Sequence, residues 1–191
     1  MSSSFFAYLF RMRYIARWAL MRNTRTENVE EHSYEVSVLA HALAVIGQQV
    51  YGKEVNPDRV ATVALFHDAP EIITGDLPTP IKYFNPAIKS AYDQVEAVAQ
   101  DKLLAMLPKE LTGAYEPLVR GEDPQVGRYV KAADKLAAWL KCLDERKAGN
   151  GEFVQAERET LRALQDMEME EVTWFLDHLG DSFGLTLDEL G

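Results

Sequence analysis

The sequence contains one cysteine, Cys142, among its 191 residues. A single thiol cannot close a disulfide within the chain, which excludes a disulfide-stapled scaffold and a zinc module built from several cysteines. No stretch approaches the roughly 18 apolar residues that are needed to span a bilayer, so no membrane partner is expected. With 47% hydrophobic and 26% charged residues, the chain is expected to be a soluble, cytoplasmic globular domain spanning 1–191.

Positive charge is also scarce, because the chain carries a net charge of −10 at pH 7. This balance argues against a nucleic-acid polymer as partner, since binding DNA or RNA requires neutralisation of phosphates. Residues 1–26 are the exception: they hold no acid and five arginines, namely Arg11, Arg13, Arg17, Arg22 and Arg25. A local arginine cluster on an acidic protein favours a small anionic ligand. The alternative interpretation is an organelle transit peptide, which is also Arg-rich and acid-poor.

Sustained strand-like alternation is missing, and apolar residues recur at helical spacing instead. The pattern predicts helices at 5–20, 32–51, 57–67, 86–107, 124–147 and 152–179. Asn56-Pro57 is a helix start signal, and Pro70 ends or kinks the helix that precedes it. The sequence therefore predicts an all-α, single-domain helical bundle.

Histidines and acids at apolar positions give the first sign of chemistry. His32 lies on the apolar stripe of its helix, and His67-Asp68 ends the next, strongly apolar helix. Asp134 falls inside the apolar face of 124–147. A buried ionised carboxylate needs a cation or several donors, and mixed imidazole and carboxylate donors suit Mn, Co, Zn, Ni or Fe. These observations favour one divalent metal in the bundle core, bound by His32, His67, Asp68 and Asp134.

Ordinary structural roles also explain some of these residues when each is taken alone. A single histidine on an apolar face, such as His32, is commonly a hydrogen-bonded core residue. Asp134 could form surface ion pairs with its helical neighbours Lys131 and Lys135. Spacing alone leaves both alternatives open.

Further motifs accompany the pattern of Glu31-His32-Ser33, His67-Asp68 and a distant Asp134. They are Arg17-Trp18, Leu20-Met21-Arg22-Asn23, Arg25-Thr26-Glu27-Asn28-Val29, Thr74-Gly75-Asp76-Leu77-Pro78-Thr79-Pro80, Lys82-Tyr83-Phe84-Asn85 and Lys141-Cys142-Leu143. Together they resemble the bacterial 5′-deoxynucleotidases of the HD-domain phosphohydrolase family. The resemblance runs from about Phe5 to Leu190 and argues against the transit peptide.

This resemblance implies an HD-type bundle with a core metal site that hydrolyses deoxyribonucleoside 5′-monophosphates to deoxyribonucleoside and phosphate. It also implies a homodimer and one divalent metal ion, such as Co, Mn or Zn, on the four ligands named above. The substrate-binding residues that it implies are Arg17, Trp18, His32, Asp68, Asp76, Leu77, Pro78 and Thr79. Pro70 departs from the best-known member of the family, which has a small polar residue there, and we expect it to alter the kink before Glu71.

Arg17 and Glu71, which the resemblance also places on the substrate side, are candidates for a catalytic role. Arg17 offers a forked donor for a phosphate dianion, and Glu71 is placed to orient a water or to move its proton. Asp76 could accept a sugar hydroxyl, and Trp18 could form a wall against the sugar. The plain alternatives are a surface acid for Glu71, a turn-forming residue for Asp76 and core packing for Trp18.

Two other functions remain open from the sequence. One is another HD-domain phosphohydrolase, either a nucleoside triphosphohydrolase or a phosphodiesterase. A second metal usually needs extra His and Asp ligands. The chain has only four histidines, and two of them, His41 and His178, are poorly placed for such a site, which favours the one-metal monophosphatase. The other is a non-catalytic, metal-stabilised regulatory bundle, against which the retention of Arg17 and Glu71 argues.

Overall fold

The computed structural model describes residues 3–82, 84–121 and 123–191, so Tyr83 of the Lys82–Asn85 motif lies outside the described part. Within these ranges the chain is all-α, as predicted. The elements in chain order are α1 (Phe5–Leu9), η1 (Met12–Tyr14), α2 (Val29–Gln49), α3 (Pro57–Phe66), α4 (Glu71–Thr74), α5 (Thr79–Lys82), α6 (Pro86–Leu104), α7 (Lys109–Arg120), α8 (Pro124–Lys147), η2 (Gly151–Phe153), α9 (Val154–Gln165), α10 (Glu170–Leu179) and η3 (Gly180–Gly184). None of the helices in the described part has the length and apolarity that a bilayer crossing requires.

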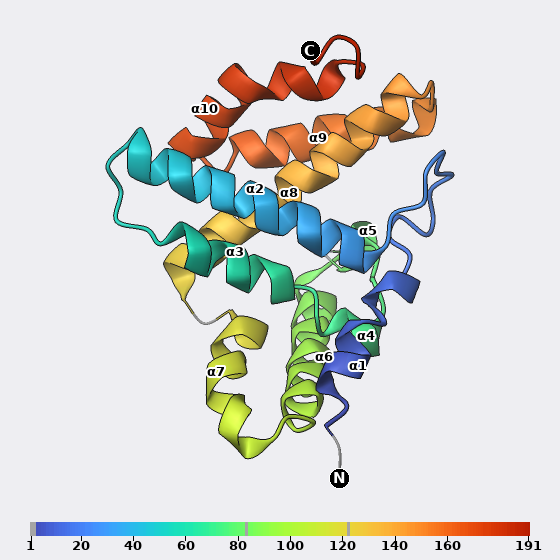
Figure 1. Ribbon diagram of the computed structural model, residues 1–191. Helices are drawn as coiled ribbons and strands as arrows, with labels where there is room; N and C mark the ends of the chain where they lie inside the picture. The colour runs from blue at the N-terminus through green and yellow to red at the C-terminus, as the bar shows by residue number, and fades with distance from the viewer. Residues whose placement is uncertain (1–2, 83, 122) are drawn as a thin grey trace.

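The long helices α2 and α8 form the centre of the bundle (Figure 1). Helix α3 packs against both of them, while α9 and α10 cover the end that lies farthest from the N-terminus. Val36, Leu43, Val60 and Leu136 are completely buried in this core. Burial of one such side chain stabilises the fold by about 1.5–3 kcal/mol. The core therefore fixes α2, α3 and α8 relative to one another.

A second apolar cluster holds the turn that follows α3. Ala69 in this turn is completely buried and shares the cluster with Phe5 of α1, Leu103 of α6 and Val119 of α7. The main-chain N–H of Ala69 donates to the carbonyl of Phe66 at 3.1 Å. The turn that carries His67 and Asp68 is thus anchored by packing on elements far away in the sequence.

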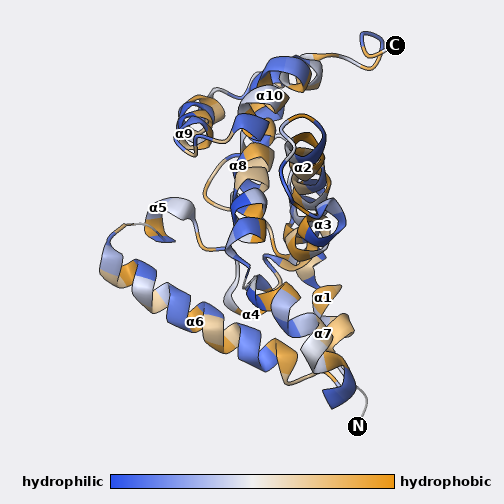
Figure 2. Cartoon of the chain, turned by 90° about the vertical axis from the view of Figure 1, so that its left-hand side faces the viewer, coloured by the Kyte–Doolittle hydropathy of each residue, from blue (hydrophilic) through white to orange (hydrophobic). Residues whose placement is uncertain are grey.

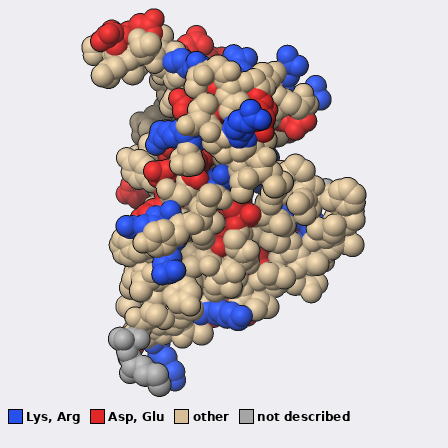
Figure 3. Space-filling view, turned by 90° about the vertical axis from the view of Figure 1, so that its right-hand side faces the viewer, with Lys and Arg blue, Asp and Glu red and all other residues tan. Residues whose placement is uncertain are grey.

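Helix α6 leads away from the bundle and carries α5 at its far end (Figure 2). Its buried residues, Ala99, Leu103 and Leu104, all lie in its C-terminal third. The N-terminal half of α6 is therefore mainly exposed. On the face shown in Figure 3, acidic side chains are visible in the hollow between this projection and the body of the molecule.

The helix starts at Pro57 and Pro124 were predicted correctly because they depend on local capping. The Asn56 side chain accepts the N–H of Arg59 at 3.0 Å, and Pro57 occupies the first turn of α3. Pro70 precedes α4, so it separates the two helices as expected. The predicted start at 32 is wrong, because α2 begins at Val29, where the Asn28 side chain caps the helix.

The predicted helix over 5–20 is wrong beyond its first turns. Residues after Tyr14 instead run beside the segment that leads into α2, with an isolated bridge between Ala16 and Asn28. The N–H of Arg17 donates to the carbonyl of Glu27 at 2.9 Å, and Trp18 adopts a positive φ of 56°. Long-range pairing has overridden the helical spacing, and it brings Arg17 to the bundle.

The predicted single helix over 152–179 is also wrong. It is divided into η2, α9 and α10, and Glu168 between α9 and α10 has a positive φ of 48°. Leu164 and Met169 on either side of this break are both buried in the main core. The chain turns at Glu168, and both side chains therefore point into that core. Helix α7 was not predicted. Helix α6 ends at Leu104 rather than at the predicted residue 107. Thr79 and Pro80 belong to α5 rather than to a loop.

Candidate active site

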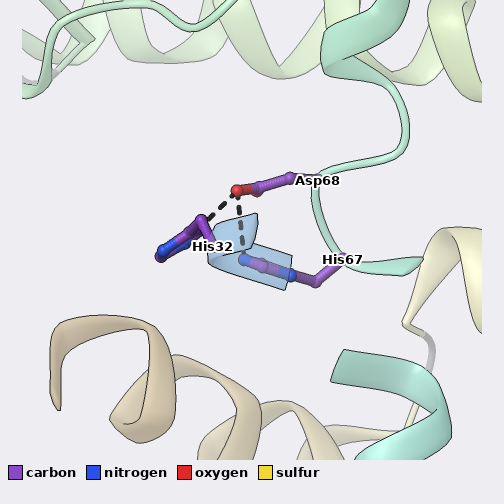
Figure 4. A group of neighbouring side chains, drawn as sticks. All are labelled: His32, His67 and Asp68. Carbon is purple, nitrogen blue, oxygen red and sulfur yellow. Dashed lines mark ion pairs between the residues drawn. The ribbon is translucent and has the colours of Figure 1, made fainter. Parts of the chain in front are cut away.

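Three predicted ligands meet where α2 passes the turn after α3. His32 lies in the first turns of α2 and is completely buried. His32, His67 and Asp68 each offer one potential ligand atom, and these three atoms lie within 4.8 Å of one another. Asp68 Oδ2 is 3.1 Å from His67 Nε2 and 3.6 Å from His32 Nε2. Figure 4 shows the Asp68 carboxylate reaching toward both imidazole rings.

Asp134 on α8 joins this group through His32. Its Oδ1 lies 3.0 Å from His32 Nε2, and its side chain is 40% exposed. The carboxylate thus faces a buried histidine, which differs from the surface pairing with Lys131 or Lys135 that the sequence left open. The group of three and Asp134 together form what we call the HD cluster: His32, His67, Asp68 and Asp134.

The HD cluster has the charge distribution that a cation needs. Burial would raise the pKa of Asp68, but the neighbouring His67 outweighs it and holds that pKa well below its usual range. Burial would lower the pKa of His67, but Asp68 outweighs it and raises the pKa to about 9. In the described structure His67 Nε2 is buried, and its 3.1 Å contact with Asp68 Oδ2 is an ion pair without hydrogen-bond geometry. Two imidazoles and two carboxylates fit a divalent metal ion.

Arg17 lies beside the HD cluster, as predicted. Its Nη1 is 3.4 Å from Asp68 Oδ2, and its Nε is 3.4 Å from Glu27 Oε1. The side chain is only 12% exposed. The extended backbone of residues 15–17, which sequence periodicity predicted as helix, is what carries this guanidinium to Asp68.

Glu27 is a site residue to which sequence reasoning assigned no role. Its carboxylate contacts Arg17, accepts the indole N–H of Trp18 at 2.9 Å, and lies 3.3 Å from His32 Nδ1. One signal was present in the sequence: Glu27 is the first acid of the chain and follows the acid-free segment 1–26. An acid at the end of an arginine-rich segment is the natural partner of one of those arginines.

Glu71 begins α4 and is buried, so it is not a surface acid. Burial, reinforced by the charges of Asp68 and Asp76, raises the pKa of Glu71 to about 9. Its Oε2 is buried without a hydrogen-bond partner among the described residues. Pro70 has ordinary helical angles, with φ of −59° and ψ of −24°, so it starts α4 and leaves Glu71 on the side of Asp68.

The predicted substrate loop lies next to this cluster. Burial raises the pKa of Asp76, and the same carboxyl interacts electrostatically with Arg17 and Asp68. Leu77 and Pro78 are partly buried and Thr79 is exposed. Trp18 packs on Phe153, with ring centroids 5.4 Å apart, so core packing accounts for one face of its indole.

Comparison with known proteins identifies the family to which this geometry belongs. Residues 4–183 match the family model described as 5′-deoxynucleotidase YfbR-like. The chain belongs to the 5′-deoxynucleotidase YfbR-like family. The predicted resemblance and the predicted phosphohydrolase class are thereby confirmed.

Individual relatives agree with this assignment. The chain is 48% identical to a 5′-deoxynucleotidase of Vibrio cholerae over 190 residues, which cover 98% of both chains. It is 47% identical to a 5′-deoxynucleotidase of Erwinia tasmaniensis over 190 residues, which cover 98% of this chain and 96% of that one.

Solved structures confirm the predicted HD-type fold. An HD-domain phosphohydrolase from Listeria innocua superposes with a TM-score of 0.82 at 26% identity, covering 94% of this chain and 88% of that one. The cyanophage S-2L HD phosphohydrolase DatZ, solved with dA and one catalytic Zn²⁺, superposes with a TM-score of 0.63 at 22% identity, covering 93% of each chain.

Proposed function

We propose that this 5′-deoxynucleotidase hydrolyses deoxyribonucleoside 5′-monophosphates to a deoxyribonucleoside and inorganic phosphate, with the HD cluster as its metal site. The observation that carries the proposal is the contact between Arg17 and Asp68. A guanidinium is the side chain best suited to a phosphate dianion. Here it lies directly beside two imidazoles and a carboxylate with the donor chemistry of a divalent-metal site.

Hydrolysis of a phosphate monoester is among the slowest uncatalysed reactions known, so the site must stabilise charge and supply a strong nucleophile. A divalent metal on His32, His67, Asp68 and Asp134 would supply Lewis acidity and lower the pKa of a water. Arg17 binds the phosphate oxygens and offsets their negative charge.

Glu71 is the proposed proton carrier. Its Oε2 is buried near Asp68 and has no protein partner in the described structure, so it is available to a water or to the substrate. The water oxygen forms the new bond to phosphorus while the bond between phosphorus and O5′ breaks. Because its raised pKa keeps Glu71 protonated near neutral pH, Glu71 gives its proton to O5′, so that the deoxyribonucleoside leaves as a neutral alcohol, and then takes back a proton from the attacking water.

Sugar recognition is assigned to Trp18 and to the segment that joins α4 to α5. Asp76 is proposed to accept the 3′-hydroxyl, which the substrate must expose because its phosphate is at the 5′ end. Trp18, Leu77, Pro78 and Thr79 are proposed to surround the sugar. We further propose that Zn, Co or Mn is the metal and that the enzyme is a homodimer, as the sequence resemblance implies.

The deciding experiment is phosphate release from a panel of nucleotides, with the metal varied after chelation. Deoxyribonucleoside 5′-monophosphates should release phosphate, while ribonucleotides and 3′-monophosphates should react much more slowly. Preferential release of triphosphate or pyrophosphate from deoxynucleoside triphosphates would favour the triphosphohydrolase alternative instead. Metal binding without turnover of any nucleotide would favour the non-catalytic bundle.

A further inference from the structure

Glu27 occupies a position between the metal-ligand side and the substrate side of the site. Its side chain is 8% exposed. Oε1 lies 3.3 Å from His32 Nδ1 and 3.4 Å from Arg17 Nε, whereas Oε2 accepts the indole N–H of Trp18 at 2.9 Å. One carboxylate therefore contacts three side chains to which three separate tasks are assigned: metal binding, phosphate binding and sugar recognition.

We propose that Glu27 is the positioning residue that sets the orientation of His32, Arg17 and Trp18 together, and so couples metal affinity to substrate affinity. The part of this inference that concerns substrate affinity, through Arg17 and Trp18, rests on the proposed function. The part that concerns metal affinity, through His32, can be tested without any turnover.

The two histidines of the HD cluster show why Glu27 matters for the metal. His67 donates from Nδ1 to the carbonyl of Ala64 at 2.7 Å, which leaves Nε2 facing Asp68. In His32 the group that faces Nδ1 is the Glu27 carboxylate, whose Oε1 lies 3.3 Å away as an ion-pair contact rather than a hydrogen bond. A carboxylate there favours the tautomer with the proton on Nδ1 and the lone pair on Nε2, and it increases the basicity of the ring. His32 Nε2 is the atom that faces Asp68 and Asp134.

Arg17 depends on the same carboxylate. Its guanidinium lies between Glu27 at Nε and Asp68 at Nη1. Glu27 balances the attraction of Asp68, which is itself a proposed ligand. Without the charge of Glu27, the guanidinium would be drawn further toward Asp68 and would compete with the metal for that carboxylate. A defect at Glu27 is therefore expected to weaken metal binding and phosphate binding in parallel.

Trp18 is the third side chain that depends on Glu27. Its backbone has φ of 56°, which is a sparsely populated conformation for a residue with a Cβ. The carbonyl of Trp18 accepts the N–H of Met21 at 2.9 Å and the Asn23 amide at 3.2 Å, while its indole N–H is bound by Glu27. These contacts together hold a conformation that the chain would otherwise leave.

The test compares Glu27→Gln with Glu171→Gln. Glu171 is a matched control because it is 1% exposed and is likewise engaged by other side chains, Lys53 and Tyr129. It lies near Gly47 of α2, 15 residues from His32 and thus about 22 Å further along that helix. The dissociation constants for Zn²⁺ and Co²⁺ are measured on chelated protein by competition with a chromophoric chelator, and kcat and KM are measured on the loaded enzyme.

Glu27→Gln is expected to weaken metal binding about 10- to 100-fold, as changes behind a metal ligand typically do. It should also change the visible spectrum of the Co²⁺ form, raise KM and lower kcat. Glu171→Gln should lower the melting temperature while metal affinity and the Co²⁺ spectrum stay as in the wild type. If Glu27→Gln does not fold, Glu27→Asp, which keeps the charge, is measured in the same way. Weakened metal binding in a folded Glu27 variant supports the proposal.

Wild-type metal affinity together with wild-type kcat/KM in a folded Glu27 variant would overturn the proposal. A lower melting temperature with no change in metal affinity or kcat/KM, as in the control, would show that Glu27 is only a structural residue and would overturn the proposal as well. Failure of the proposed function gives a different pattern: wild-type protein that binds metal but releases no phosphate from any deoxynucleotide. In that case the metal dissociation constants of the variants still decide the role of Glu27.

Discussion

Two groups of buried charged side chains flank the segment 17–27, and they differ in how completely their polar atoms are satisfied. One is the HD cluster with its neighbours, where His67 Nε2 and Glu71 Oε2 are buried without a hydrogen bond in the described structure. The other surrounds Glu145 of α8, which is completely buried. We call this second group, formed by Thr24, Arg25, Lys141, Glu145 and Asn150, the Glu145 cluster.

The Glu145 cluster fastens the segment at Thr24 and Arg25 to α8 and to the turn that follows it. Glu145 accepts the N–H of Thr24 at 2.9 Å, the hydroxyl of Thr24 at 2.7 Å and the amide of Asn150 at 2.8 Å. It also accepts the N–H of Arg25 and pairs with Lys141, which donates to the carbonyl of Arg25. A fully satisfied polar network rigidifies a fold, whereas buried polar atoms without a hydrogen bond, beside a group of perturbed titratable side chains, are typical of a functional site. The comparison separates a structural cluster from the candidate catalytic one.

The largest effect is expected from the HD cluster itself. His67→Ala or Asp68→Ala should abolish both metal binding and phosphate release, because each removes a donor that no other described side chain replaces. His41→Ala is the control, since His41 is half-exposed on the opposite face of α2. Metal content by atomic emission and phosphate release decide the outcome. A purified variant with stoichiometric metal and near-normal turnover would show that the ligand assignment is wrong.

Glu71→Ala should have a smaller effect that is confined to the rate. Metal and substrate should still bind, while kcat falls about 10²- to 10⁴-fold, the usual contribution of a proton carrier. Glu30→Ala serves as control, because Glu30 is an exposed acid paired with Arg13. Unchanged turnover of Glu71→Ala in a steady-state assay would contradict the proposed role.

Trp18→Ala tests the sugar side. A 2′-hydroxyl that is desolvated against an indole without a partner costs roughly 1–3 kcal/mol, which is about ten- to a hundredfold in rate. The variant should therefore lose much of the preference for deoxyribose while keeping its metal. The ratio of kcat/KM for a matched deoxy and ribo pair measures this. The same ratio in wild type and variant would leave Trp18 as a packing residue against Phe153.

The smallest effect on catalysis, and a large one on folding, is expected at Glu145. Glu145→Gln should lower the free energy of unfolding by about 3 kcal/mol, because it leaves Lys141 buried beside an uncharged partner. Burial would raise the pKa of Glu145, but Lys141, Asn150 and Thr24 outweigh it and hold it well below the usual range.

This depressed pKa also fixes the pH dependence of that stability. The contribution is fully present above the unfolded pKa of about 4.3 and is lost as pH falls toward the folded value. Denaturant melts at pH 7 and at pH 3 should thus show a difference between wild type and Glu145→Gln that is large at pH 7 and smaller at pH 3. A difference that does not change with pH would contradict the electrostatic explanation.

The two clusters also show what a sequence reveals and what it conceals. The HD cluster could be anticipated because His32 and Asp134 are polar residues at apolar positions of regular helices, and because His67-Asp68 directly follows the strongly apolar helix α3. The helix starts at Asn56 and Pro124 could be anticipated because capping is local. Both signals are contained within a few neighbouring residues.

The rest depends on contacts between distant segments. Nothing in the spacing of residues 15–28 indicates that Arg17 pairs with Glu27, or that Glu145 anchors Thr24 from 121 residues away. The break at Glu168 likewise follows from the need to bury both Leu164 and Met169. Such features arise from tertiary packing, which outweighs local helical preference.

The lone cysteine gives the molecule a built-in reporter of its own opening. Cys142 on α8 is completely inaccessible, and burial raises the pKa of its thiol to about 12. A thiol in that state does not react with a disulfide reagent until local unfolding exposes it. The labelling rate of the unmodified protein therefore measures how often the packing around α8 opens, without an added probe. Because α8 also carries Asp134, slower labelling on addition of a divalent metal would report how strongly the ion restrains the bundle.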